Sequence, residues 1–349
     1  MGKRTTPSAP EAERVNLKTL ASLLDLSQTT ISLVLNNSPS AKSIPQQTRE
    51  RVLEAARKFN YRPNYFARSL RQSRSMSIAV LAPDLSEGYF TLVMNGVQAA
   101  LLEAHYFYFT ASHYWNAELI REYPRRMMER AVDGFLLLNT HADFLSPLPV
   151  VAISAHTPTA GVSNLVLDHV KAAELALSHL HELGHRRIAM MKGPEIIPDS
   201  EYRWAAIHEV AKSYGIPLDP ALFMETPANN GSPESGYVPV KELLSRTRDF
   251  TAIFCFNDIA AIGAIRALKD AGLLVPEDVS VVGFDDILGA SYHTPSITTV
   301  RQPLEEMGRQ GARILLERIE RPSQEFAAEI VLEPELIVRE STAAARLRA

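Results

Sequence analysis

From Ser77 onward, short apolar or β-branched runs alternate with longer amphipathic stretches, and this alternation constrains the fold more than any other feature of the chain. The apolar runs are, in order, SIAVLA, FYFTAS, GFLLLN, the LVL of residues 165–167, RIAMM, TAIFCF and SVVGF. The helices expected between them are Phe90–Glu103, a segment ending at Arg130, one ending at Leu183, Trp204–Tyr214 and Ile259–Ala271. Strands separated by helices pair in parallel, because each helix returns the chain to the same edge of the sheet. The restart of the pattern at Leu165 predicts two doubly wound α/β lobes.

The composition fits a large folded protein without disulfide bonds. A chain of 349 residues, 46% of them hydrophobic and 22% charged, is long enough for more than one domain. Its one cysteine, Cys255, has no partner for an internal disulfide. Residues 1–14 lack the apolar core of a signal peptide, and no apolar run reaches the roughly 18 residues of a membrane span. We therefore expect a cytoplasmic protein that does not enter the membrane.

Positive charge is concentrated ahead of the alternating region. Residues 1–75 contain 13 Lys and Arg against 5 Asp and Glu, whereas residues 76–349 carry a net charge of −12. A basic module on an acidic body is typical of proteins that neutralise DNA phosphates with one domain only. A solvated basic arm would give the same balance, so the patterning within this head has to decide between the two.

The head has the pattern of a helix-turn-helix. A first helix is expected after the N-cap residue Asn16, and Ser27 is the expected N-cap of a second helix. The turn between them is very short, so the helices cross at a large angle and the start of the second helix projects outward. The side chains expected to read base edges there are Gln28, Thr29, Thr30 and Ser32.

A third helix and a short linker complete the head. The third helix, about Pro45–Phe59, has apolar side chains at helical spacing that close a small core. Pro63 disfavours a helical backbone before it, and Asn64 can cap one further turn, Tyr65–Leu70. Isolated helices shorter than about 12 residues are marginal in water, so this turn is expected to order only against DNA or a second copy of itself.

The sequence resembles the LacI/GalR family of bacterial transcription regulators. In the head the resemblance rests on LASLLDLSQTTISLVLN, TRERVLEAARKFNYRPN and ARSL; in the body it rests on SIAVLAPDLS, RAVDGFLLL, HLHELGHRRIA, AIFCFNDIAAIGAIRAL, VPEDVSVVGFDD and TPSITTVRQPLEEMGR. It implies that the second helix enters the major groove and that a pair of hinges enters the minor groove, where Leu70 matches a wedge between base pairs. The DNA-binding residues that it implies are Ser27, Gln28, Thr29, Thr30, Ser32, Leu33, Asn64, Ala67, Arg68 and Leu70. An ordinary linker turn is the alternative for the last four.

The head departs from the family pattern at three places. Leu33 stands where the family usually has a guanine-reading Arg, so it either touches a thymine methyl group or is a surface leucine, and the half-site preference is open. Asp25 replaces the usual turn Gly, which is tolerable because Asp can adopt the left-handed conformation. The loop from Asn36 to Ser43 is longer than is typical of the family.

The resemblance also implies that the body has the fold of periplasmic sugar-binding proteins and holds a small effector between its lobes. The carboxyl ends of parallel strands, where open α/β sheets bind ligands, carry the candidate groups. The effector-binding residues that we expect are Asp84, Tyr89, Phe90, Arg203, Asn257 and Asp285. Arg203 and Asp285 match the family's effector-gripping pair, with a surface ion or a structural hydrogen bond as the alternative; the other four could equally be core residues. Glu87-Gly88 replaces the Asn-Pro of many relatives, which leaves this wall of the cleft in doubt.

The expected domain boundaries follow from these assignments. The chain is divided into an arm (1–14), the helix-turn-helix domain (15–62), a hinge helix and linker (63–75), a two-lobed effector and dimerisation body (76–340), and a tail (341–349). Crossovers near Asn164, Pro295 and Arg321 give lobe 1 as about 76–163 and 296–321, and lobe 2 as about 164–295 and 322–340.

An enzyme is the rival interpretation. His181-Glu-Leu-Gly-His185 matches the zinc motif H-E-x-x-H, but Gly184 is expected to end the helix, so that the two imidazoles do not share one helical face. Cys255 lies in an apolar strand and is expected to be buried filler rather than a nucleophile. We expect no catalytic residue, metal or cofactor.

The expected function is that of a sequence-specific transcriptional regulator, acting as a repressor. A homodimer would bind a near-palindromic operator, and an effector, expected to be a sugar or sugar derivative, would control its affinity. A nucleobase or other non-sugar effector is the alternative within regulation, and a carbohydrate-binding enzyme is the alternative outside it. The tail has no leucine heptads, so nothing in it supports a tetramer.

Overall fold

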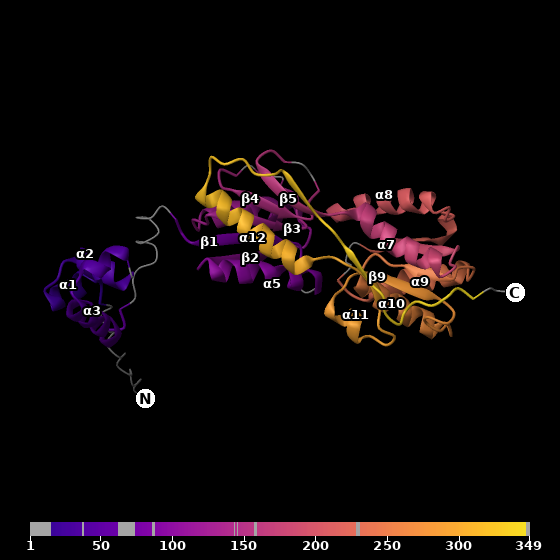
Figure 1. Cartoon of the computed structure of the whole chain (residues 1–349), viewed down its shortest axis with the longest axis horizontal. Coiled ribbons are helices and arrows are strands. Elements are labelled where there is room, and N and C mark those ends of the chain that lie inside the picture. The colour runs from indigo at the N-terminus through magenta and orange to yellow at the C-terminus, as the bar shows by residue number, and fades with distance from the viewer. Residues whose placement is uncertain are drawn as a thin grey trace, which may run out of the picture. The chain divides into compact units, whose positions relative to one another are not determined.

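The computed structural model describes residues 15–36, 38–61, 74–85, 88–142, 144, 146–156, 159–227 and 231–346 (Figure 1). The contacts divide the chain into two compact units, Met1–Ser75 and Met76–Ala349, and each is considered by itself. The expected hinge residues Asn64, Ala67, Arg68 and Leu70 lie outside the described residues, as does Glu87. In the described part of the chain, no helix has both the length and the apolar character that a membrane crossing requires.

The first unit contains the helix-turn-helix. Its elements are α1 (Leu17–Leu24), α2 (Gln28–Leu35), a 3₁₀ turn (Pro39–Ser43) and α3 (Gln46–Lys58). Both predicted N-caps are confirmed: the side chain of Asn16 accepts a hydrogen bond from the Thr19 amide, and Ser27 accepts one from the Thr30 amide. Asp25 ends α1 in the left-handed conformation, with φ 54° and ψ 45°, which permits the short turn.

The core of the head is small but closed. Leu20, Ile31 and Val52, one from each α-helix, are fully buried against one another's helices. Burying a large aliphatic side chain contributes about 1.5–3 kcal/mol, so three such anchors suit a module of this size. Leu33 is only partly exposed, yet it is absent from this hydrophobic cluster.

The described residues of the second unit form two six-stranded sheets, as the alternation of strands and helices predicts for a two-lobed body. The first sheet is parallel throughout, in the order β11-β5-β4-β3-β1-β2. Its strands are β1 (Ser77–Ala82), β2 (Phe107–Ser112), β3 (Gly134–Leu138), β4 (Val150–Ile153), β5 (Val162–Leu167) and β11 (Glu329–Leu332). Helices α5 (Gly88–Glu103) and α12 (Leu304–Glu320) cover one face (Figure 1), and α6 (Ala117–Met128) packs on the other.

The second sheet has the order β12-β10-β9-β8-β6-β7, and only the β10–β12 pair is antiparallel. Its strands are β6 (Ile188–Lys192), β7 (Phe223–Glu225), β8 (Ala252–Phe254), β9 (Ser280–Asp285), β10 (Thr298–Arg301) and β12 (Glu335–Ile337). Helices α7 (His169–Glu182) and α8 (Pro198–Ser213) pack on one face, and α9 (Glu234–Arg246) and α10 (Asp258–Asp270) on the other. A short 3₁₀ turn (Pro220–Leu222) precedes β7, and α11 (Leu288–Tyr292) follows β9.

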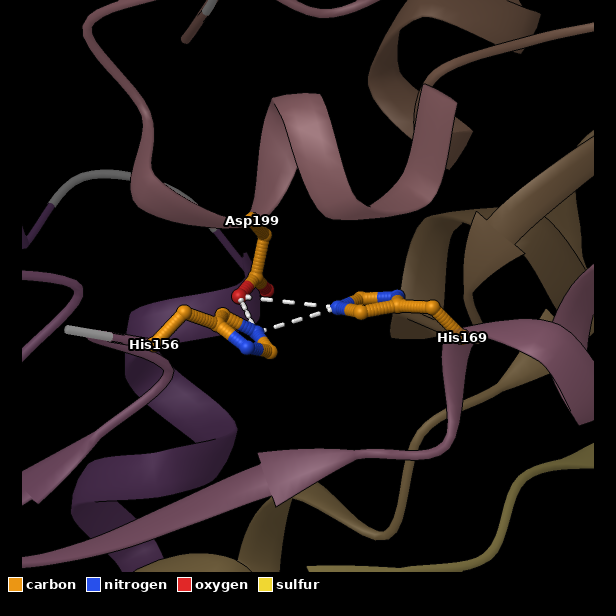
Figure 2. A group of neighbouring side chains, drawn as sticks. All are labelled: His156, His169 and Asp199. Carbon is orange, nitrogen blue, oxygen red and sulfur yellow. Dashed lines mark hydrogen bonds and ion pairs between the residues drawn. The ribbon is translucent and has the colours of Figure 1, made fainter. Parts of the chain in front are cut away.

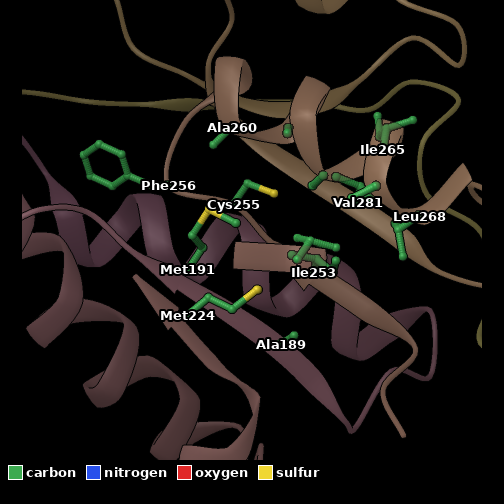
Figure 3. Close-up of a cluster of buried hydrophobic side chains, with 14 of the residues drawn as sticks. Ala189, Met191, Met224, Ile253, Cys255, Phe256, Ala260, Ile265, Leu268 and Val281 are labelled. Carbon is green, nitrogen blue, oxygen red and sulfur yellow. The ribbon is translucent and has the colours of Figure 1, made fainter. Parts of the chain in front are cut away.

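Cys255 lies in the hydrophobic core beneath α10, as expected of buried filler (Figure 3). Its side chain is 2% exposed among neighbours that include Met191 and Ala260. Burial raises the pKa of the thiol, so it stays protonated and unreactive at neutral pH.

The three crossovers between the lobes lie later in the chain than the sequence suggests. Strand β5 still belongs to the first sheet, so the first crossover follows Leu167 rather than Asn164. Strand β10 pairs with β9, so the chain leaves the second lobe after Arg301 rather than near Pro295. It returns between β11 and β12 rather than near Arg321. Hydrogen-bond partners decide which sheet a strand joins, and periodicity within the strand carries no information on those partners.

Helices α5 and α12 approach each other closely at two glycines. A Cβ atom on Gly96 would lie 1.8 Å from the Glu305 carbonyl oxygen, and one on Gly308 would lie 2.0 Å from the Val93 carbonyl oxygen. Only a residue without a side chain fits at either position, and the two helices form one tight pair on the first sheet.

Candidate effector cavity and DNA-reading face

The proposed DNA-reading side chains occupy the start of α2. Ser27, Gln28 and Thr29 are exposed, whereas Thr30 and Ser32 are partly exposed. The hydroxyl groups of Ser27 and Thr30 lie 2.8 Å apart and are engaged in the helix cap. Gln28 and Thr29 are therefore the polar groups with the most freedom to reach a base edge.

A cavity lies between the two lobes of the body, where the carboxyl ends of the parallel strands meet. About 490 Å³ of space not filled by atoms lies in and at the mouth of this cavity, part of it open solvent. The residues that line it are Pro83, Asp84, Tyr89, Phe90, Trp115, Asn139, Ile197, Asp199, Arg203, Phe256, Asn257, Asp285 and Gln302. All six side chains expected from the sequence to bind an effector are among them.

Arg203 extends from α8 into the base of this cavity. Its guanidinium lies against the rings of Phe284 and Phe256, 3.7 and 4.7 Å from their centroids, and Nη1 donates a 2.6 Å hydrogen bond to the Phe256 carbonyl oxygen. The side chain is 5% exposed, and burial lowers its pKa, with Asp285 opposing the shift. These contacts fix the position of the guanidinium before any ligand arrives.

Asp285 ends β9 on the same side of the cavity. Burial raises the pKa of its carboxyl to about 7, with Arg203 and a hydrogen bond from Gln302 opposing the shift. Gln302 Nε2 donates that bond to Asp285 Oδ1 over 2.7 Å. A carboxyl that titrates near neutral pH can donate or accept a hydrogen bond to a ligand hydroxyl.

Aromatic side chains form the opposite wall. Tyr89 and Phe90 start α5 and meet edge to face, with ring centroids 5.0 Å apart. The Tyr89 hydroxyl lies 3.0 Å from Ser154 Oγ, and burial raises its pKa, so it remains a neutral phenol. Trp115 adds a further ring that is only partly buried.

Two of the expected residues also have structural roles. The side-chain oxygen of Asn257 accepts a hydrogen bond from the Ala260 amide and thereby caps α10. Asp84 Oδ1 accepts one from the Leu85 amide at 2.6 Å. Backbone amides thus hold both oxygens beside the strand ends that border the cavity.

The cavity also contains polar residues that the sequence did not single out, namely Asn139, Asp199 and Gln302. Asn139 directly follows β3, a position as informative as that of Asn257 after its own strand. Asp199 is in the first turn of α8, which begins at Pro198 and not near Trp204 as expected. Proline at the first helical position with acidic residues after it is a start signal that could have placed Asp199 four residues before Arg203.

Several buried polar atoms of the lining have no hydrogen-bond partner among the residues that the structure describes. They include Arg203 Nε, Asn139 Oδ1 and Gln302 Oε1. Leaving a buried polar atom unpaired costs about 1–3 kcal/mol of folding free energy, so such atoms are usually paired with a ligand or with water. They come from both lobes, and one polar molecule in the cavity could satisfy groups on each side.

Asp199 is ionised within this polar environment. Burial by itself raises the pKa of the carboxyl, but the neighbouring imidazoles of His156 and His169 outweigh it and hold the pKa below its ordinary range. Asp199 Oδ2 is also 3.9 Å from Arg203 Nη2, which adds an attractive charge on the cavity side.

The H-E-x-x-H segment does not form a zinc site. Helix α7 ends at Glu182, and Gly184 follows with φ +87°, so His185 lies beyond the helix as predicted. Both ring nitrogens of His185 are engaged: Nδ1 is 2.9 Å from Thr251 Oγ1, and Nε2 is 3.0 Å from the Ala343 carbonyl oxygen. His181 instead packs edge to face on Tyr214.

Comparisons with known proteins agree with this architecture. Residues 16–64 match the model for bacterial regulatory proteins of the lacI family, and residues 177–342 match the periplasmic binding protein-like domain. The HTH-type transcriptional repressor PurR of Haemophilus influenzae is 31% identical over 93% of this chain and 98% of its own length.

Solved structures give the same assignment. The transcriptional regulator CelR in complex with cellobiose is 30% identical, with a TM-score of 0.70 over 93% of this chain and 99% of that one. A LacI family regulator from Enterococcus faecium with bound ribose is 29% identical, with a TM-score of 0.68 over 77% and 100% of the two chains. The chain therefore belongs to the LacI family of bacterial transcriptional regulators, with a helix-turn-helix head and a periplasmic-binding-protein-like body.

Proposed function

We propose that the chain is a homodimeric repressor that binds a near-palindromic operator. A small polyhydroxylated molecule, a sugar or sugar derivative, binds in the inter-lobe cavity and controls the affinity for that operator. The observation that carries the ligand half of this proposal is the set of buried, unpaired polar atoms contributed by both lobes. A ligand that pairs with them on each side stabilises the arrangement of the lobes in which it is bound.

The chemistry of the cavity fits a polyol. Carboxyl, amide and guanidinium groups can pair with several hydroxyls, while Tyr89, Phe90 and Phe256 offer apolar surface to the C–H face of a sugar ring. The similar structures with cellobiose and ribose bound have ligands of this class. Nucleobases and nucleosides are the alternative ligands to be tested, because aromatic walls also stack on planar rings.

The coupling path that we propose runs through the crossovers. Gln302 lines the cavity and is the first residue of the connection from β10 to α12. In this connection the chain passes from the second lobe to the first. A ligand contact at Gln302 therefore acts on a segment that any change of the inter-lobe angle must move. Linkage requires DNA binding to change effector affinity by the same factor.

A gel-shift assay on genomic fragments at several salt concentrations tests the DNA half. We expect selective binding that weakens steeply with salt and is lost when residues 1–75 are removed. A thermal-shift screen of sugars, sugar phosphates, nucleobases and nucleosides tests the ligand half, since a ligand at about 100 times its Kd stabilises the protein by about 2.7 kcal/mol. Carbohydrate turnover without selective DNA binding would refute the proposal.

A further inference from the structure

A second group of polar side chains converges beside the effector cavity. His156 follows β4, His169 is the first residue of α7, and Asp199 is in the first turn of α8; all three point toward one spot (Figure 2). They are separated by 13 and 30 positions in the sequence, so no local motif brings them together. Each is at least nine-tenths buried, with exposures of 7%, 6% and 2%.

The three facing atoms have the spacing of metal ligands. The two Nε2 atoms are 3.1 Å apart, and Asp199 Oδ1 is 2.5 Å from His156 Nε2 and 3.7 Å from His169 Nε2. Ligands held about 2.0–2.1 Å from a tetrahedral zinc ion are about 3.3 Å from one another. One ion at the centre would therefore need only small shifts of these side chains.

Protons alone do not satisfy this arrangement. If both Nε2 atoms carry hydrogen and face Asp199, the two N–H groups oppose each other across 3.1 Å. If only one carries hydrogen, the N–H can bond the other nitrogen or the carboxylate oxygen, and the second nitrogen still has its lone pair near the carboxylate oxygen. A divalent cation at the centre satisfies all three lone pairs at once.

We propose that His156, His169 and Asp199 form a binding site for a divalent transition-metal ion that braces the two lobes. Two imidazoles and one carboxylate suit Zn²⁺, Co²⁺ or Ni²⁺ rather than Ca²⁺ or Mg²⁺, which prefer oxygen ligands. Three protein ligands leave a further coordination position for water or another oxygen donor.

The surroundings hold the ligands in place. The ring of Tyr202 stacks on His156 with centroids 4.4 Å apart, and its hydroxyl donates a hydrogen bond to the His156 carbonyl oxygen at 3.2 Å. Such outer contacts fix the orientation of a metal-binding imidazole. His156 belongs to the lobe of the first sheet, whereas α7 and α8 pack on the second, so a bound ion would tie one lobe to the other.

Titration of the full-length, metal-stripped protein with Co²⁺ tests this site. We expect one ion per chain with the visible absorption of nitrogen and oxygen ligation, displaced by Zn²⁺, and an increase of the melting temperature when Zn²⁺ is added. His169→Asn and His156→Asn should each weaken Co²⁺ binding by at least about 100-fold and abolish the Zn²⁺-dependent shift in melting temperature.

His208→Asn is the matched control, because His208 lies on α8, the helix that carries Asp199, but packs against Trp204, away from the cluster. It should bind Co²⁺ as the parent does. The proposal is overturned if the parent binds no ion, or if either cluster variant, folded by circular dichroism, binds Co²⁺ as tightly as the parent. Neither result bears on operator binding, so this test is independent of the proposed regulatory function.

Discussion

Gln302 donates a 2.7 Å hydrogen bond to Asp285, which joins the end of β9 to the residue that directly follows β10. Gln302 is 3% exposed and Asp285 6%, so the bond is shielded from bulk water. The pair lines the cavity at the point where the chain is about to leave the second lobe. A change in the protonation state of Asp285 therefore acts on this hydrogen bond, which belongs both to the cavity lining and to the start of the crossover.

The raised pKa of Asp285 predicts a specific pH dependence of stability. Burial raises this pKa to about 7 from its ordinary value of 3.8, so between about pH 4 and pH 7 the native carboxyl keeps a proton that the unfolded chain releases. Raising the pH through this window therefore lowers the free energy of unfolding, by at most about 1.4 kcal/mol per pH unit. Asp285→Asn lacks the titrating carboxyl but keeps an oxygen that accepts the hydrogen bond from Gln302.

Urea denaturation of the parent and of Asp285→Asn, at intervals from pH 4 to pH 8, measures the effect. The stability of the parent relative to the variant should fall as the pH rises to about 7 and then level off. Asp258 also has a pKa raised by burial, and it is present in both proteins, so most of its contribution cancels in the difference. A difference that stays constant over the whole range would contradict the assignment.

Arg203→Ala should remove the effector response while leaving operator binding in place. The substitution deletes the hydrogen bond to the Phe256 carbonyl oxygen and the packing on Phe284, and it leaves a buried acceptor unpaired. We expect a loss of about 2–4 kcal/mol in the free energy of unfolding. Operator affinity in gel shifts, with and without effector, measures the functional part.

Arg266→Ala is the control for Arg203→Ala. Arg266 is exposed and pairs with Asp270 one turn along the same helix, so its removal should cost no more than about 0.5 kcal/mol. Retention of a full effector response in Arg203→Ala would show that the arginine only supports the fold.

The six residues expected at the effector site all line the cavity, whereas the path of the chain between the lobes differs from the expected one. Asp84, Asn257 and Asp285 follow apolar strands, and parallel strands bring their carboxyl ends to one edge, so position in the chain was sufficient to bring these residues together. The helix caps Asn16 and Ser27 are local features in the same sense.

Features that depend on partners distant in the sequence could not be predicted from local sequence patterns. Residues 164–167 continue a strand of the first lobe because they pair with β11, and the first two of them also pair with β4, a strand that was itself not expected. His156, His169 and Asp199 meet only after two lobes have formed, so no spacing rule applies to them. Leu33 departs from the family pattern, so the sequence did not predict its environment. The structure shows it partly exposed and outside the core of the head.

Gly96→Ala should destabilise the first lobe. The added Cβ would lie 1.8 Å from the Glu305 carbonyl oxygen, which is backbone, so α5 and α12 must separate. Overpacking of this kind costs about 1–3 kcal/mol or more. Gly289→Ala is the control, because its nearest neighbour would be a side-chain atom 3.6 Å away. Thermal unfolding should show a lower melting temperature for the first variant alone, and equal melting temperatures would disprove the close approach.

Leu33→Ala should separate the two roles that the sequence left open for this residue. Leu33 is partly exposed and absent from the core of the head, so its truncation should change the free energy of unfolding by less than about 1 kcal/mol. Ile31→Ala, which empties a fully buried site two residues earlier on α2, should instead cost about 2–5 kcal/mol. If Leu33 touches a thymine methyl group, Leu33→Ala should weaken operator binding and make it less sensitive to a thymine-to-cytosine change at one half-site position. Unchanged affinity across a half-site library would identify Leu33 as a surface leucine without a DNA contact.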